Sequence, residues 1–231
     1  MQFFLSHEDG YYALTKAGTI ALIALVAVLI LVTALVKVKG KSDSPKKSIF
    51  STRQLVFAGL SLALAYALSF VKLFPIPFGG SVTLFSMLFV AIVGYFYGPK
   101  IGLIAAFSYS ILQFLQDGTT YILTPLQAAL DYLLAFTMLG VSGFFAKKKN
   151  GLILGFIIGA IARATVHTIG GYIYWMAYMP EDFPQALAPI YPICYNFGFI
   201  VVEVILTVIL LLLPPVKKGI AYVKRMALGE I

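Results

Sequence analysis

A charge-free apolar run near the N-terminus constrains the fold of this chain more than any other feature. Residues 17–36 contain no ionisable side chain, and a helix of about 20 apolar residues crosses the hydrocarbon core of a bilayer. A lysine-rich stretch follows the run and no basic n-region precedes it, which favours an uncleaved anchor over a signal peptide. We therefore expect a membrane-spanning helix here.

Six more apolar runs follow, each separated from the next by Gly, Pro or charged residues. The chain is 61% apolar and only 11% charged, a balance that a soluble fold of this size cannot bury. The sequence predicts an all-α integral membrane protein, a six-helix bundle preceded by one extra helix. The seven expected spans are residues 17–36, 55–71, 82–97, 101–116, 122–145, 152–179 and 188–213.

The basic residues between the spans predict the orientation of the chain in the membrane. Fourteen of the 17 Lys and Arg residues fall on one side when the seven spans alternate, and only Lys16 and Lys72 fall on the other. Because cytoplasmic loops carry the excess of basic residues, the N-terminus is expected outside and the C-terminus inside. The expected segments are an extracellular N-terminus (1–16), an extra helix (17–36), a basic cytoplasmic linker (37–53), a substrate-binding membrane domain (54–215) and a basic cytoplasmic tail (216–231).

Four ionisable residues lie inside the expected spans, where such groups usually face a cavity or a partner. They are Asp131, Arg163, His167 and Glu203. Gln127 and Asp131 are four residues apart and share a helix face. Arg163, His167, Gly171 and Trp175 form a stripe with the same spacing, and Tyr191 and Asn196 begin the last span. Three helices are thus expected to converge polar and aromatic groups in the outer half of the membrane, as in a small-molecule site.

Structural interpretations of the same residues remain open at this stage. Asp131 and Arg163 are also consistent with an intramembrane ion pair, and His167 with a packing residue. Tyr174 and Tyr178 suit an interfacial aromatic belt. Glu203 lies deeper than the cluster and receives no role.

The chain shows no pattern of an enzyme or of a resident cofactor. Cys194 is the only cysteine and the two histidines are far apart in sequence, so no metal site is expected. No Ser-His-acid arrangement is visible, and no glycine-rich phosphate loop precedes a helix. ATP would therefore have to be hydrolysed by another protein.

From Ser51 onward the chain resembles the thiamin-binding S component of energy-coupling factor transporters. The resemblance rests on the stretch from Gln127 to Leu134, the stripe from Arg163 to Trp175, and Tyr191 with Asn196. It implies capture of thiamin, or a close relative of thiamin, from outside a bacterial cell. The partners that it implies are a transmembrane coupling subunit and two cytoplasmic ATPases. The thiamin-lining positions that it implies are Asp131, Tyr132, Arg163, His167, Gly171, Trp175, Tyr191 and Asn196.

Three departures from the family pattern bear on the expected pocket. Asp131 stands where the family typically has Glu, and Arg163 where it typically has Lys. A pocket-closing tryptophan of the first outer loop would fall near Gly80, where the sequence has no aromatic residue, so a more open pocket is expected. Arg163 is expected to neutralise Asp131 or to meet the hydroxyethyl or phosphate-bearing end of the ligand. The alternative function is a stand-alone, proton-coupled secondary transporter of a small aromatic or heterocyclic metabolite.

Overall fold

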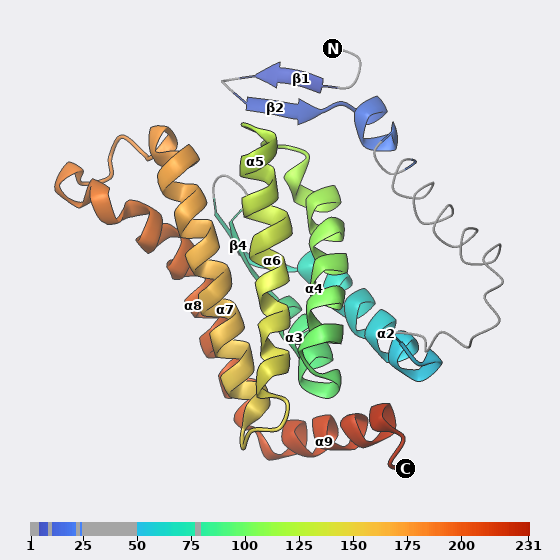
Figure 1. The fold of residues 1–231 in the computed structure, drawn as a ribbon. Helices are drawn as coiled ribbons and strands as arrows, with labels where there is room; N and C mark the ends of the chain where they lie inside the picture. The colour runs from blue at the N-terminus through green and yellow to red at the C-terminus, as the bar shows by residue number, and fades with distance from the viewer. Residues whose placement is uncertain (1–4, 9–10, 22–23, 25–49, 77–79) are drawn as a thin grey trace.

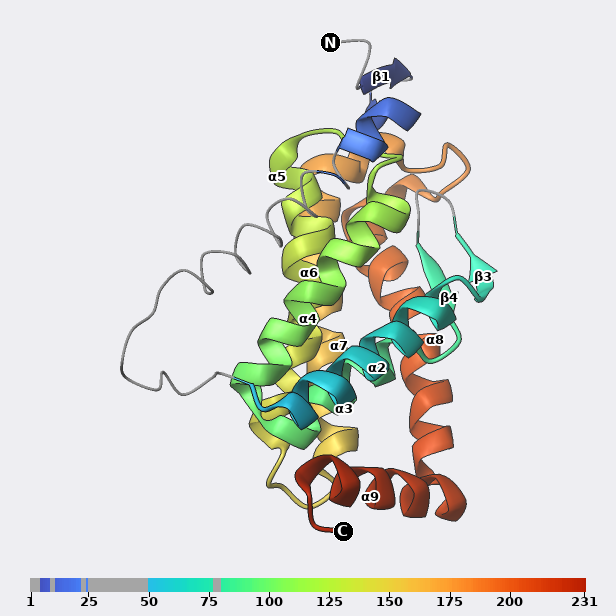
Figure 2. The ribbon, with the colours of Figure 1, turned by 90° about the vertical axis from the view of Figure 1, so that its right-hand side faces the viewer.

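The computed structural model describes residues 5–8, 11–21, 24, 50–76 and 80–231. Helices dominate these residues (Figure 1). Helices α4 (Pro99–Gln113), α6 (Ala135–Thr137), α7 (Gly151–Gly170) and α8 (Tyr191–Leu212) run alongside one another, and α2 (Thr52–Ser69) crosses them obliquely (Figures 1 and 2). The expected helical bundle is therefore present.

Three helical segments among the described residues are long and apolar enough to cross a membrane. They are Pro125–Phe145, Gly151–Tyr178 and Gln185–Leu212. The first joins α5 (Pro125–Ala128) to α6 through a π-helical segment (Ala129–Leu134) and ends in a 3₁₀ segment (Met138–Phe145). Helix α3 (Ser86–Tyr97) is apolar but shorter. The sequence predicted all of these segments to within a few residues, except at the start of α3.

The expected third span begins four residues too early, because residues 82 and 83 belong to a β-hairpin. Strands β3 (Lys72–Pro75) and β4 (Ser81–Thr83) pair in antiparallel register, with Phe74 opposite Val82. Val82 is nevertheless almost fully buried, which explains why an apolar pattern extended the predicted helix through it. The hairpin positions Gly80 and Ser81 beside α8.

Helix α9 (Pro214–Leu228) is the clearest addition to the sequence-based description. Residues 216–231 were expected only as a basic tail, yet Pro214 and Pro215 start a helix that lies across one end of the bundle (Figures 1 and 2). Its inner face packs on the core through Val216, Ile220 and Ala227. Tyr97 Oη also donates a hydrogen bond to the Ala227 carbonyl oxygen at 3.3 Å.

Small residues bring α3, α4 and the 3₁₀ segment 138–145 into close contact. A Cβ atom on Gly102 would lie 2.6 Å from Gly94 Cα, and one on Gly140 would lie 2.6 Å from the Gly102 carbonyl oxygen. Ser61 Oγ donates to the Phe89 carbonyl oxygen at 2.6 Å, tying α2 to α3. Small side chains at helix contacts are the usual packing device in membranes. They let the backbones of these segments lie in direct contact.

The expected extra span at residues 17–36 lies largely outside the described residues. Its described start, up to Ala21, is helical. Before it, strands β1 (Leu5–Glu8) and β2 (Tyr11–Leu14) form an antiparallel hairpin. The backbone N–H of Leu14 donates to the Thr119 carbonyl oxygen at 2.8 Å. The hairpin therefore contacts the turn that follows α4, at the end of the bundle opposite α9 (Figure 1).

Candidate functional site

All eight residues selected from the sequence line one cavity. Helices α7 and α8, the π-helical segment 129–134 and the β3–β4 hairpin enclose it. The selected residues in its wall are Asp131, Tyr132, Arg163, His167, Gly171, Trp175, Tyr191 and Asn196. The predicted convergence of three helices on one level is therefore present in the fold.

The Asp131 carboxylate is the centre of the polar contacts in this cavity. Gln127 Nε2 donates to Asp131 Oδ2 at 2.7 Å, and Trp175 Nε1 donates to the same oxygen at 2.9 Å. Gln127 is itself held by the Leu123 backbone N–H, which donates to its Oε1 at 3.1 Å. Two donors on one oxygen fix the orientation of the carboxylate and leave Oδ1 turned toward α7.

His167 stands between Arg163 and Asp131. Arg163 Nε donates to His167 Nε2 at 3.3 Å, and His167 Nδ1 lies 3.7 Å from Asp131 Oδ1. Because Nε2 accepts a hydrogen bond, this network assigns the ring proton to Nδ1, facing the carboxylate. The interpretation of Asp131 and Arg163 as a direct ion pair is therefore wrong, since the His167 imidazole lies between the two side chains.

The Arg163 guanidinium packs instead against an aromatic ring. Its Cζ lies 4.0 Å from the centroid of the Phe136 ring, a distance at which the ring face attracts a cation. Tyr132 stacks on the same Phe136 ring. The two ring centroids are 6.3 Å apart and the angle between the ring planes is 17°. Arg163 and the two rings therefore form the deep, aromatic side of the cavity.

Three π-helical turns lie at the cavity end of the helices. They comprise Phe114–Gly118, Ala129–Leu134 and Gly171–Trp175. A π-turn holds one more residue than an α-turn and occurs often at functional sites. The first begins directly after Gln113, the second holds Asp131 and Tyr132, and the third carries Trp175 to the carboxylate. These π-helical turns are thus concentrated where the site residues lie.

Helices α7 and α8 approach closely because residue 171 is glycine. A Cβ atom there would lie 2.9 Å from Pro192 Cβ and 3.2 Å from Asn196 Nδ2. Asn196 Nδ2 donates to the carbonyl oxygens of Pro192 at 2.9 Å and His167 at 3.3 Å. The amide nitrogen of Asn196 is therefore committed to the backbone. A larger residue at position 171 would collide with α8, a steric requirement for glycine that the sequence spacing alone did not reveal.

An aromatic wall on α8 was only partly recognised in the sequence. Tyr191, Tyr195 and Phe199 recur every four residues and all line the cavity. Their ring centroids are 6.0 Å apart for Tyr191–Tyr195 and 5.9 Å for Tyr195–Phe199. Only Tyr191 was predicted as a site residue, although the i, i+4, i+8 spacing of rings beside Asn196 would have identified the other two.

Glu203 accepts hydrogen bonds from Thr83, which lines the cavity, and from Met87. Its Oε2 accepts hydrogen bonds from Thr83 N at 2.9 Å and Thr83 Oγ1 at 2.8 Å, and its Oε1 accepts from Met87 N at 3.2 Å. The N-cap residue of α3, Phe85, has no side-chain acceptor and a φ of 61°. Glu203 therefore supplies from α8 the cap that the first turn of α3 lacks.

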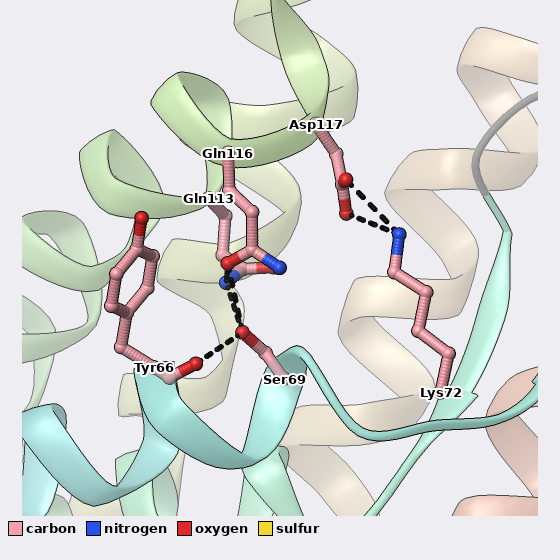
Figure 3. A network of polar contacts seen from close by, with 6 residues as sticks. All are labelled: Tyr66, Ser69, Lys72, Gln113, Gln116 and Asp117. Atoms are coloured by element: carbon pink, nitrogen blue, oxygen red, sulfur yellow. Dashed lines mark hydrogen bonds and ion pairs between the residues drawn. The ribbon is translucent and has the colours of Figure 1, made fainter.

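A second polar network joins α2 to the cavity wall (Figure 3). Gln113, which lines the cavity, donates through Nε2 to Ser69 Oγ at 3.0 Å and to Gln116 Oε1 at 3.1 Å. Beside it, Lys72 Nζ lies 3.0 Å from both carboxylate oxygens of Asp117. This partly exposed pair ties the β3–β4 hairpin to the end of α4, and no sequence pattern pointed to it.

Comparisons with known proteins identify the family of this chain. The family model for the thiamine transporter protein (Thia_YuaJ) matches residues 55–222. The thiamine transporter ThiT of Bacillus subtilis (strain 168) is 30% identical over 150 residues, 59% of this chain and 76% of the relative.

Two solved structures are also similar to this chain. The structure of ThiT from Listeria monocytogenes is 28% identical, with a TM-score of 0.54 over 70% of this chain and 94% of that one. A structure described as the S component of a bacterial ECF transporter is 25% identical, with a TM-score of 0.42 over 67% and 93%. The family model covers well over half of the length of this chain, and the chain therefore belongs to the thiamine transporter family.

Proposed function

We propose that this chain captures thiamin from outside the cell as the substrate-binding subunit of an ATP-driven energy-coupling factor transporter. The observation that carries this proposal is the cavity in which Asp131, His167, Trp175 and Asn196 converge. It combines one oriented carboxylate, one amide and several ring faces in a largely apolar wall. That is the composition of a site for a small, cationic heterocycle.

The two halves of thiamin match different groups of the cavity. The aminopyrimidine offers an amino donor, which suits the Asp131 carboxylate and Asn196 Oδ1, since Asn196 Nδ2 is already engaged. The permanently cationic thiazolium suits the ring faces of Trp175, Tyr191 and Tyr195. A neutral heterocycle of the same size would lose the second set of interactions.

Arg163 is assigned to the hydroxyethyl end of the ligand rather than to the thiazolium. It is 9% exposed, lies beneath His167 and packs on Phe136. Two positive charges at close range would repel in this low-dielectric site. A hydroxyl oxygen, by contrast, can accept from the guanidinium.

We further propose a seven-span topology in the plasma membrane, with the N-terminus outside and the cavity open to the outside. The cavity lies at the bundle end that carries the β3–β4 hairpin and α5, whereas helix α9 lies at the opposite end (Figure 1). The loop 146–150, which contains three of the basic residues, adjoins α9, since Lys224 Nζ donates to the Ala146 carbonyl oxygen at 3.5 Å. The positive-inside rule places that basic end in the cytoplasm. This arrangement supports capture from outside.

Helix α2 is the proposed contact with the transmembrane coupling subunit. Its two pairs of small residues differ in environment, since Ser61 and Ala65 are buried against the bundle while Gly59 and Ala63 are exposed. A Cβ atom on Gly59 would meet nothing within 4 Å. An exposed small-xxx-small pair allows another helix to approach closely, and the cytoplasmic ATPases would act through that partner.

Uptake measured with and without the proposed partners tests this function. Radiolabelled thiamin should accumulate in cells that express this chain with a coupling subunit and its ATPases, and should be only bound when the chain is expressed alone. Calorimetry on the purified chain should show saturable thiamin binding that Asp131→Asn weakens. Accumulation by the chain alone, driven by a proton gradient, would instead identify the proton-coupled secondary transporter.

A further inference from the structure

We propose that Tyr195 is a specificity-determining residue of the cavity and that Gly80 is its size-matched partner on the β3–β4 hairpin. The inference rests on the proposed thiamin site and deepens it. The Tyr195 side chain is assigned one aromatic face for the cationic ring of the ligand. The missing side chain of Gly80 leaves the space that the Tyr195 ring occupies.

The steric relation between the two residues is direct. A Cβ atom on Gly80 would lie 2.7 Å from Tyr195 Oη, 3.2 Å from Tyr195 Cζ and 3.3 Å from Phe199 Cε1. Contacts below about 3.0 Å are not tolerated by a Cβ atom without a shift of its neighbour, and the first of these is below that limit. The Tyr195 ring therefore fills the position where a side chain from the hairpin would otherwise enter.

This contact lies at the place where a more open pocket was expected, near Gly80. The hairpin contributes Gly80, Ser81 and Thr83 to the cavity wall, and α8 contributes Tyr195 at the same place. The aromatic ring that the loop sequence lacks is thus supplied by the neighbouring helix. Two elements that are far apart in sequence thus share one space in the cavity wall, with the side-chain bulk on α8.

The position of Tyr195 in the ring series of α8 assigns its chemistry. It lies between Tyr191 and Phe199, with tilted and edge-on geometries of 46° and 77°, so the three rings form a continuous aromatic surface. It also directly precedes Asn196, whose amide is held by the α7 backbone. The cationic ring of a ligand whose aminopyrimidine half reaches Asn196 would therefore lie against Tyr195, where the ring quadrupole attracts it.

The first experiment separates charge recognition from simple wall contact. Thiamin and 3-deazathiamin, which has a neutral thiophene in place of the thiazolium, are titrated into wild type, Tyr195→Phe and Tyr195→Leu by calorimetry. We expect Tyr195→Leu to weaken thiamin binding by about 5- to 30-fold more than binding of the neutral analogue. Tyr195→Phe should retain most of the preference. Equal losses for both ligands in Tyr195→Leu would overturn the assignment.

The second experiment tests the size match without relying on any ligand. Gly80→Phe should lower the melting temperature of the purified protein, whereas Gly80→Phe with Tyr195→Ala should recover much of it. A double variant no more stable than Gly80→Phe alone would overturn the pairing. If wild type fails to bind thiamin, the proposed function fails, but the melting temperatures still decide whether residues 80 and 195 compete for one space.

Discussion

Trp175 Nε1 donates a 2.9 Å hydrogen bond to Asp131 Oδ2, which joins the π-helical end of α7 to the central carboxylate of the cavity. Trp175 is the only tryptophan of the chain. Its indole is therefore both a wall of the cavity and the only strong fluorophore. Any ligand that contacts Asp131 must also change the surroundings of this ring.

Thiamin should quench the fluorescence of Trp175 in a saturable manner. Excitation at a wavelength that tyrosine does not absorb isolates the indole, and thiamin, its phosphates and its pyrimidine half are titrated separately. Asp131→Ala and His167→Ala should abolish the quenching at low ligand concentration, since one removes the carboxylate and the other its support. Glu181→Gln, an exposed carboxylate outside the cavity wall, is the control and should quench like wild type.

Absence of quenching by every ligand, in protein with a normal helical circular dichroism spectrum, would contradict the thiamin assignment. It would leave the bundle and its cavity unaffected. Quenching that survives in Asp131→Ala would instead place the ligand away from the carboxylate.

Gly170→Ala should weaken thiamin binding through Asp131. A Cβ atom at residue 170 would lie 2.6 Å from Asp131 Oδ1, the oxygen that faces His167, so the carboxylate must rotate or shift. We expect a loss of affinity of about 10- to 100-fold, corresponding to the roughly 1–3 kcal/mol of overpacking a filled site. Calorimetry of the purified variant measures it.

Gly159→Ala on the same helix is the matched control for Gly170→Ala. Its new Cβ would lie 3.3 Å from Leu139 Cα, so it introduces a tight helix contact away from the cavity wall. It should change the melting temperature without changing affinity. Similar affinity losses in both variants would show that the effect arises from the packing of α7 and not from Asp131.

Glu203→Gln should destabilise the protein, because the amide cannot accept all three hydrogen bonds that the carboxylate accepts from Thr83 and Met87. We expect a loss of about 1–3 kcal/mol, seen as a lower melting temperature in detergent. ATP-driven thiamin uptake by cells should persist at temperatures where the variant is folded. A variant of normal stability that binds thiamin but no longer takes it up would favour a coupling-proton role for Glu203, and with it the secondary transporter.

The sequence predicted the site better than it predicted the connections around it. Regular spacing placed Gln127 beside Asp131 and aligned Arg163 with His167, because both pairs are one α-turn apart. The same rule alone would not bring Trp175 to the carboxylate. Each step of four drifts by about 40° on an α-helix, and the π-helical turn Gly171–Trp175 takes up the extra residue.

Features that depend on contacts between distant segments left no pattern in the sequence. The depth of Asp131 along its helix also differs from the prediction. Asp131 was expected nine residues inside its span, but the helix begins at Pro125, behind the N-cap Thr124. Asp131 therefore lies about 9 Å from the helix start. Tyr195 on α8 fills the space beside Gly80 of the β3–β4 hairpin. Glu203, also on α8, caps the first turn of α3. A local periodicity cannot encode either of these tertiary contacts.

Gly59→Leu on α2 should block uptake without weakening thiamin binding. The exposed position has free space around its Cβ, so a leucine fits the isolated protein and obstructs only a partner helix that needs close approach. Uptake of radiolabelled thiamin by cells that contain the coupling subunit and ATPases should fall to the level of cells that lack them. Calorimetry of the same variant should give the wild-type affinity.

Gly198→Leu on α8 is the control for Gly59→Leu, since Gly198 is also exposed in a helix and its Cβ would also meet nothing within 4 Å. It carries the same change in size and helix propensity to a different lipid- or partner-facing surface. We expect normal uptake from this variant. If both leucines abolish uptake, the partner surface extends over α8 as well, and if neither does, the exposed small-residue pair of α2 is not the coupling contact.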